Sequence, residues 1–146
     1  MQVRQKIFVE EQGFPLEIEI DEQDQHCRHI IALLRQPHNQ GDNQEVDTWI
    51  PIGNLRMFEY QPKVGKIGRV GVLKEYRGLS IGRRLMECAH RIAKVEMGWK
   101  TIRLHAQYDK ADFYTRLGYL TPDPTQFIED DFPHVAMIMD LDQIPS

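Results

Sequence analysis

The sequence predicts a mixed α/β domain built around one β-sheet. Short apolar runs of strand length recur along the chain, one segment of about twenty residues has helical periodicity, and glycines stand where predicted helices end. The chain has 146 residues, of which 41% are apolar and 27% charged, as in ordinary globular proteins. This length is enough for a core of its own, so we expect residues 1–146 to form a single domain.

The first half of the chain is expected to contain one helix and three strands. Residues 3–12 are helix-like, because Val3 and Ile7 lie four positions apart. Short apolar runs predict the strands, at 28–34, 50–58 and 66–73. The polar, glycine-containing segment 37–48 is expected to be a long surface loop.

The second half begins with the clearest helix, over residues 79–98. Its apolar positions are spaced by four and three, which places them on one face: Ile81, Leu85, Cys88, Ile92 and Val95. Gly98 supplies a C-terminal stop. A strand at 101–107, a short helix at 110–118 that ends at Gly118 and a strand at 135–141 complete the order.

The charge pattern argues against a nucleic-acid binder. The formal net charge is −4 and the isoelectric point about 5.8, whereas such proteins usually carry a basic face. Cations gather locally, however, at Lys74, Arg77, Arg83 and Arg84, which indicates a small polyanion as ligand.

The chain also lacks the sequence features of a membrane or secreted protein. No apolar run approaches the ~20 residues of a membrane span, and the N-terminus lacks the apolar centre of a signal peptide. Its two cysteines, Cys27 and Cys88, are far apart, which disfavours a disulfide framework. We therefore expect a cytoplasmic protein with no membrane partner.

The sequence YRGLSIGRRL (76–85) joins a predicted strand to the central helix. The first N–H groups of a helix lack partners within it, and the helix dipole adds positive character there, so such a junction binds phosphates. Gly78, Ser80 and Gly82 are small enough to let a ligand approach the backbone. The segment matches neither the Walker pattern GxxxxGK[ST] nor the dinucleotide pattern GxGxxG.

Two motifs give the chain a resemblance to a known family. RGLSIG (77–82) matches most of Q/R-x-x-G-x-G/A, with Ser80 in place of the middle glycine, and KADFYTRLGY (110–119) matches AxxFYxxxGF. Together they resemble the GNAT superfamily of N-acetyltransferases. FVEEQGFP (8–15), AQ (106–107) and PHVAM (133–137) are similar to its ElaA-like branch, so the likeness covers nearly the whole chain.

The resemblance implies the GNAT fold, a mixed and mostly antiparallel sheet flanked by helices. The family begins with a strand before its first helix, and that strand is expected to be missing here.

The resemblance also implies acetyl-CoA as cosubstrate, with no metal. Its pyrophosphate would be held by the backbone N–H groups of the loop, which are those of Gly78, Leu79, Ser80, Ile81 and Gly82. The pantetheine arm would pair with the edge of the preceding strand at Val70, Gly71 and Val72, and Gly71 is expected to be a bulge that opens this edge. Arg77 and Arg83 would supplement the phosphate site.

Acetyl transfer by direct attack needs a neutral amine, a stabilised oxyanion and a proton for the leaving thiolate. By resemblance, Tyr114 is the candidate acid, and an N–H near Val72 would stabilise the oxyanion. The glutamate that many relatives carry before the loop is absent from RVGV (69–72). Three residues remain open as the base, Glu59, His105 and His134, and water is a further alternative.

The sequence leaves the acceptor amine open. A small amine, an amino sugar phosphate such as glucosamine 6-phosphate, and a protein lysine or N-terminus all fit the chemistry, and the acidic chain favours a small molecule. A non-catalytic acyl-CoA sensor is the alternative class of function, and family members are monomers or homodimers. A zinc site at His26, Cys27 and His29 is disfavoured, because no second cluster completes a tetrahedron, and Cys88 is expected in the core.

Overall fold

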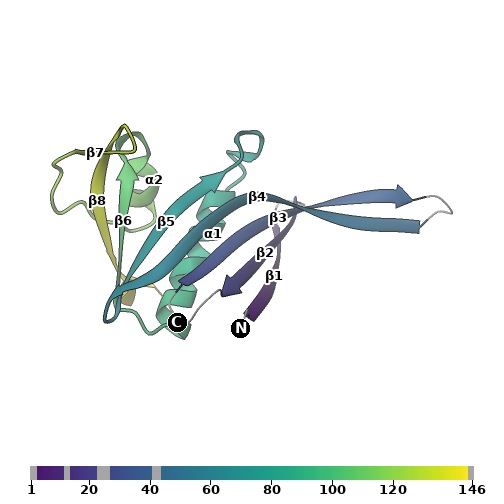
Figure 1. Ribbon diagram of the computed structural model, residues 1–146, viewed down its shortest axis with the longest axis horizontal. Coiled ribbons are helices and arrows are strands. Elements are labelled where there is room, and N and C mark those ends of the chain that lie inside the picture. The colour runs from purple at the N-terminus through teal and green to yellow at the C-terminus, as the bar shows by residue number, and fades with distance from the viewer. Residues whose placement is uncertain (1–2, 12–13, 23–26, 41–43, 145–146) are drawn as a thin grey trace. The chain divides into compact units, whose positions relative to one another are not determined.

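The computed structural model describes residues 3–11, 14–22, 27–40 and 44–144 (Figure 1). The chain divides into two compact units. Unit 1 contains residues 1–56 and 69–86, and unit 2 contains residues 57–68 and 87–146. Strands β4 (Gln44–Gln61) and β5 (Val64–Val72) and helix α1 (Ile81–Arg91) contribute residues to both units.

The strands follow the order β1-β2-β3-β4-β5-β6-β8-β7. Pairs β1–β2, β2–β3, β6–β8 and β7–β8 are antiparallel, whereas β5 and β6 are parallel. The predicted fold class, a mixed and mostly antiparallel sheet with flanking helices, is confirmed.

Unit 1 contains β1 (Val3–Glu11), β2 (Phe14–Glu22) and β3 (Cys27–Gln40), followed by parts of β4 and β5. Its buried side chains come from alternate strand positions, as expected for a sheet with one covered face. They include Ile18, Ile20, Ile30, Ala32 and Leu55 from the strands and Ile81, Leu85 and Met86 from α1. Burying each large aliphatic side chain contributes about 2 kcal/mol, so α1 is held to the sheet mainly by apolar contact.

The expectation of a helix at 3–12 is wrong. Residues 3–11 form β1, which pairs with β2 in a register that sets Ile7 opposite Ile18. A spacing of four is a multiple of the two-residue strand period as well as about one helical turn, so the Val3–Ile7 spacing fits both structures. The first strand of the family, expected to be missing here, would precede Val3 and so lies outside the described residues.

The expectation of a long loop at 37–48 is also wrong. β3 runs to Gln40 and β4 begins at Gln44, so the strands extend through most of this polar segment. Polar residues are compatible with antiparallel strands, because neighbouring strands satisfy each other's backbone groups whatever the side chains.

Unit 2 is built on β6 (Thr101–Gln107), which lies between β5 and β8 (Phe132–Asp140). β6 pairs with β8 from Thr101–Asp140 to Gln107–His134. The strands expected at 101–107 and 135–141 are therefore confirmed. β7 (Phe127–Glu129) was missed, and it joins β8 through Asp130 and Asp131, whose φ angles of 50° and 66° are those of a tight hairpin turn.

The expected helix at 110–118 is present as a 3₁₀ turn, Tyr108–Lys110, followed by α2 (Ala111–Arg116). Gly118, with φ of 108°, ends this segment as predicted.

The central helix changes character before it ends. α1 continues into a π-helical turn at Ile92–Glu96, where the Met97 N–H donates to the Ile92 carbonyl. A π turn takes an extra residue, so it rotates the following side chains off the apolar face. Val95, expected on that face, is 61% exposed for this reason. Gly98, with φ of 69°, stops the helix as predicted.

Candidate functional site

The segment between β5 and α1 is a well-fixed turn in unit 1. The Leu73 N–H donates to the Ile52 carbonyl of β4 at 2.8 Å, which holds the end of β5 in place. A 3₁₀ turn, Lys74–Tyr76, follows, with the Tyr76 N–H 2.9 Å from the Leu73 carbonyl. The chain therefore enters the glycine-containing segment from an anchored strand.

Two residues in left-handed backbone then direct the chain into α1. Gly78 has φ of 87° and Ser80 has φ of 64°. Only glycine adopts this region without strain, which gives a physical reason for a glycine at the position of Ser80 in the motif. The Ser80 carbonyl accepts the first helical hydrogen bond, from the Arg84 N–H at 3.0 Å.

The start of α1 offers unpaired backbone donors. N–H groups at the first two helical positions, those of Ile81 and Gly82, have no carbonyl one turn earlier in the helix. Ile81 is buried and anchors this turn, while Gly78, Leu79 and Arg83 are exposed. The geometry suits an anion, because donors and the positive end of the helix dipole face outward together.

Arg77 has a structural role in the same turn. Its Nε donates to the Val72 carbonyl at 3.1 Å, so the side chain folds back onto the end of β5. The remaining guanidinium N–H groups have no partner within the described parts of the chain, which leaves them available to a ligand.

β5 is distorted just before the turn. Arg69 adopts φ of 57°, a left-handed conformation that occurs in β-bulges, and the bulge expected at Gly71 stays a prediction. The parallel ladder with β6 ends at Lys66–Arg103, although both strands continue. Val70, Gly71 and Val72 thus follow a point where regular pairing has stopped.

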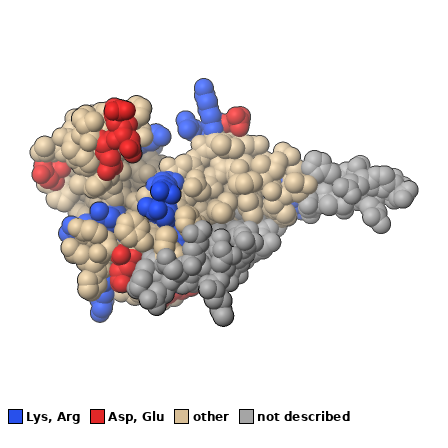
Figure 2. All heavy atoms as spheres, viewed as in Figure 1, with Lys and Arg blue, Asp and Glu red and all other residues tan. Residues whose placement is uncertain are grey.

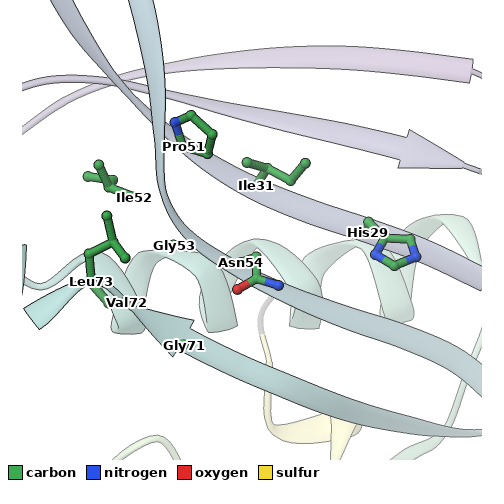
Figure 3. A pocket seen from close by; sticks show the side chains of 9 residues that line it. All are labelled: His29, Ile31, Pro51, Ile52, Gly53, Asn54, Gly71, Val72 and Leu73. Atoms are coloured by element: carbon green, nitrogen blue, oxygen red, sulfur yellow. The ribbon is translucent and has the colours of Figure 1, made fainter.

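A cavity of about 450 Å³ lies beside this part of β5 in unit 1 (Figure 3). It is lined by His29 and Ile31 of β3, by Pro51, Ile52, Gly53 and Asn54 of β4, and by Gly71, Val72 and Leu73. A Cβ added at Gly71 would lie 3.7 Å from the Asn54 Oδ1, an ordinary contact, so protein packing does not require glycine there. The volume is within the range of small-molecule sites.

Tyr114 belongs to unit 2, on α2. Its ring makes edge contacts with Phe113 and Tyr119, at centroid distances of 5.0 and 5.9 Å. Burial raises the pKa of its hydroxyl to about 12, because the phenolate would lose hydration. Tyr114 is therefore protonated at neutral pH, and its hydroxyl has no hydrogen-bond partner among the described residues.

His105 and His134 share one carboxylate. Glu129 places Oε1 3.2 Å from His105 Nδ1 and Oε2 3.8 Å from His134 Nε2. His134 Nδ1 lies 2.8 Å from the Phe132 carbonyl, and the Phe127 ring contacts both imidazoles. These contacts link β6, β7 and β8, so a structural role accounts for the presence of both histidines.

Glu59, the third candidate base, stabilises the turn between β4 and β5. Its Oε1 accepts the Lys63 N–H at 3.2 Å. All ten residues expected at the cofactor site belong to unit 1, and the four catalytic candidates belong to unit 2. None of those four lines the cavity of Figure 3.

A second cavity, of about 310 Å³, lies in unit 2. Its polar lining comes from Tyr60, Lys66, Arg103, His105 and Asp123. Lys66 lies over the Tyr60 ring, with Nζ 4.2 Å from the centroid. Lys66 and Arg103 are direct partners in the β5–β6 ladder.

The described residues give no sign of a metal site. Within these ranges, no group of three or more His, Cys, Asp or Glu converges as metal ligands, and His26 lies outside them. Cys27 and Cys88 are free thiols. Burial, more than the nearby Glu96, raises the pKa of the Cys88 thiol to about 11, so it stays protonated.

The face shown in Figure 2 is mixed in charge. Lys and Arg side chains are interspersed with Asp and Glu over the face shown in Figure 2. No helix in the described ranges is long and apolar enough to cross a membrane.

Sequence reasoning missed two features of these sites. His29 was considered only as a metal ligand, although strand alternation sets it on the face opposite the buried Ile30. His90 and Tyr119 form a buried hydrogen bond of 2.8 Å in unit 2, which neither local sequence indicates.

Comparison with known proteins decides the family. The family description "Acetyltransferase (GNAT) domain" matches residues 39–120, which include the turn into α1 and all of α2. A Bacillus subtilis (strain 168) protein named "Putative acetyltransferase" is 35% identical over 139 residues, which cover 93% of this chain and 84% of the relative. The chain belongs to the GNAT acetyltransferase family. It is an enzyme of the N-acetyltransferase type.

Solved structures agree with this GNAT assignment. An acyl-CoA N-acyltransferase from Pseudomonas aeruginosa is 26% identical, with a TM-score of 0.59 over 77% of this chain and 68% of the other. Escherichia coli ElaA has a TM-score of 0.60, with 82% of this chain and 75% of ElaA covered. Its identity of 21% supports the GNAT fold alone.

Proposed function

We propose that this GNAT enzyme transfers the acetyl group of acetyl-CoA to a primary amine of a small molecule by direct attack. The observation that carries the proposal is the paired left-handed backbone at Gly78 and Ser80, which opens the N-terminus of α1 toward an anion. We further propose one N-acetyltransferase domain over residues 1–146, in the ElaA-like branch of the family, acting as a monomer or homodimer without a metal.

The cofactor-binding residues in this proposal are those of the turn and the strand before it. N–H groups from Gly78 to Gly82 would hold the pyrophosphate, with Arg77 and Arg83 adding charge. The edge of β5 at Val70, Gly71 and Val72 would pair with the pantetheine arm. The end of the β5–β6 ladder at Lys66 supports this assignment, because an extended ligand needs unpaired strand groups.

Tyr114 would act on the leaving sulfur. Full transfer of a proton from a hydroxyl with a pKa near 12 to a thiolate of ordinary pKa near ~8.5 costs about 5 kcal/mol. A hydrogen bond from the protonated hydroxyl to the developing thiolate carries no such cost. We therefore assign Tyr114 the role of hydrogen-bond donor to sulfur, with the final proton from water.

The base in this proposal is open among Glu59, His105, His134 and water. Each of the three side chains already contacts a structural partner. The contacts therefore favour none of them over the others as the base. The amine acceptor is also open, and an amino sugar phosphate such as glucosamine 6-phosphate remains one member of the set to test.

Calorimetric titration with acetyl-CoA, coenzyme A and ATP tests the cofactor assignment. We expect micromolar binding of both CoA forms and little binding of ATP. Release of free thiol on addition of amines, followed with a chromogenic disulfide, tests turnover. Absence of CoA binding would overturn the cofactor assignment, and binding without thiol release for any amine would overturn the transfer reaction.

A further inference from the structure

The cavity beside Gly71 and Val72 contains one titratable side chain. Among its nine lining residues, His29 alone carries an acid–base side chain, and Asn54 is the only other polar side chain. Aliphatic or proline side chains supply most of the rest, from Ile31, Pro51, Ile52, Val72 and Leu73. The cavity thus combines a proton acceptor with a largely apolar wall.

His29 is held in place by its strand and by a neighbour. It lies in β3, and its backbone neighbour Ile30 is fully buried, so the strand is fixed at this position. The Cys27 Sγ lies 4.0 Å from His29 Nε2, within reach of a weak contact from a thiol. The imidazole is half-buried, which leaves it accessible from the cavity (Figure 3).

The glycines of the cavity leave room beside β5. Gly53 is constrained, since an added Cβ would lie 3.1 Å from both the Gly71 carbonyl and Leu85 Cδ1. Gly71 has no such restriction, and its missing side chain leaves the space toward Asn54 free. An acceptor in this space would lie next to Gly71 and Val72, two of the residues assigned above to the pantetheine arm.

We propose that this cavity binds the acceptor, a primary amine with an uncharged and largely apolar body, and that His29 accepts the proton which the amine loses. The inference rests on the proposed transfer from acetyl-CoA. It assigns a catalytic residue that the sequence motifs do not indicate.

The transfer forms one C–N bond and breaks one C–S bond. The amine nitrogen bonds to the thioester carbonyl carbon, and the C–S bond then breaks with the electron pair on sulfur. The nitrogen becomes acidic as its new bond forms, and its proton passes to the His29 imidazole and from there to water. The thiolate takes one proton from water, so the products are an amide and coenzyme A.

The lining residues also indicate which class of amine the cavity would bind. Apolar walls disfavour an ammonium ion and so raise the fraction of neutral, attacking amine. Cationic side chains favour binding of a phosphate and carboxylates favour binding of a polyamine, and the nine residues lining the cavity include no Lys, Arg, Asp or Glu. The cavity therefore favours an aralkylamine over glucosamine 6-phosphate or spermidine.

The test compares His29→Gln with wild type in the thiol-release assay. The acceptors are 2-phenylethylamine, spermidine and glucosamine 6-phosphate, each with saturating acetyl-CoA. We expect 2-phenylethylamine to be the best acceptor and His29→Gln to lower kcat by about 10²- to 10⁴-fold, the range for loss of a general base. Acetyl-CoA affinity should be unchanged, and added imidazole should restore part of kcat.

Two matched variants separate the competing assignments. His105→Gln and His134→Gln remove the other histidines considered as base. A large loss of kcat in either of these, with His29→Gln close to wild type, would overturn the role of His29. Preference for spermidine or glucosamine 6-phosphate would overturn the acceptor class.

The proposed function can fail separately from this inference. Wild type that binds acetyl-CoA and acetylates 2-phenylethylamine, with kcat retained in His29→Gln, contradicts only the inference. Wild type that releases no thiol with any amine contradicts the transfer reaction and the inference together.

Discussion

His90 Nε2 lies 2.8 Å from the Tyr119 hydroxyl, in the interior of unit 2. His90 is 2% exposed, and burial lowers the pKa of its imidazole to about 4. The imidazole is therefore neutral at pH 7 and shares a hydrogen bond with the Tyr119 hydroxyl, which stays protonated because burial keeps the Tyr119 pKa well above its usual range. The two polar groups satisfy each other where water is absent.

This pair predicts a loss of stability in mild acid. Unfolding returns the His90 pKa from about 4 to its ordinary value of 6.5, so between these values the unfolded chain binds more protons than the folded one. The contribution of His90 to the free energy of unfolding is complete above pH 6.5 and decreases by roughly 3 kcal/mol as the pH drops toward 4. Denaturant unfolding at pH 7, 6, 5 and 4 measures it, and His90→Gln should show a smaller decrease. Equal pH dependence in both proteins would contradict the prediction.

Gly65 is required by the Trp99 ring in unit 2. A Cβ added at Gly65 would lie 2.0 Å from the Trp99 ring atoms Cε3 and Cζ3, and Trp99 is buried. Gly65→Ala should therefore lower the free energy of unfolding by about 3 kcal/mol or more, because a buried indole cannot move aside without cost. Gly68→Ala is the matched control on the same strand, since nothing lies within 4 Å of its added Cβ. Similar melting temperatures for the two variants would show that Trp99 relocates freely.

Ser80 tests the importance of the left-handed turn. Its φ of 64° is strained for a branched side chain, so Ser80→Val should cost about 1–2 kcal/mol in the folded turn and weaken acetyl-CoA binding at least ~10-fold. Ser80→Gly relieves the strain and should bind at least as well as wild type. Calorimetry on the two variants checks this, and equal affinity of both would mean that the backbone of the turn does not contact the ligand.

Tyr114→Phe removes the proposed hydrogen bond to sulfur. The hydroxyl has no partner in the described chain, so its loss should leave the fold intact while kcat falls by about 10²-fold. Acetyl-CoA affinity should stay within about threefold of wild type. Tyr108→Phe, an exposed tyrosine on the preceding 3₁₀ turn, is the control and should keep full kcat. Full activity of Tyr114→Phe would remove it from the mechanism.

Sequence patterns located the elements that carry strong local information. The strand at 101–107 is found with its predicted bounds, and the stops at Gly98 and Gly118 are present as left-handed glycines. The same reasoning failed at residues 3–12, where a spacing of four fits helix and strand alike. It also failed at Val95, because a π turn rotates this side chain away from the apolar face of the helix.

The sequence by itself determined the family and the turn into α1, because both depend on residues close together in the chain. Motif spacing and the need for small residues near an anion are local properties. The tertiary structure alone decided which distant side chains meet. Pairing of β3, β4 and β5 brings His29 and Asn54 to the Gly71 cavity, and Glu129 joins His105 to His134. Such contacts depend on strand order and register, which no short stretch of sequence encodes.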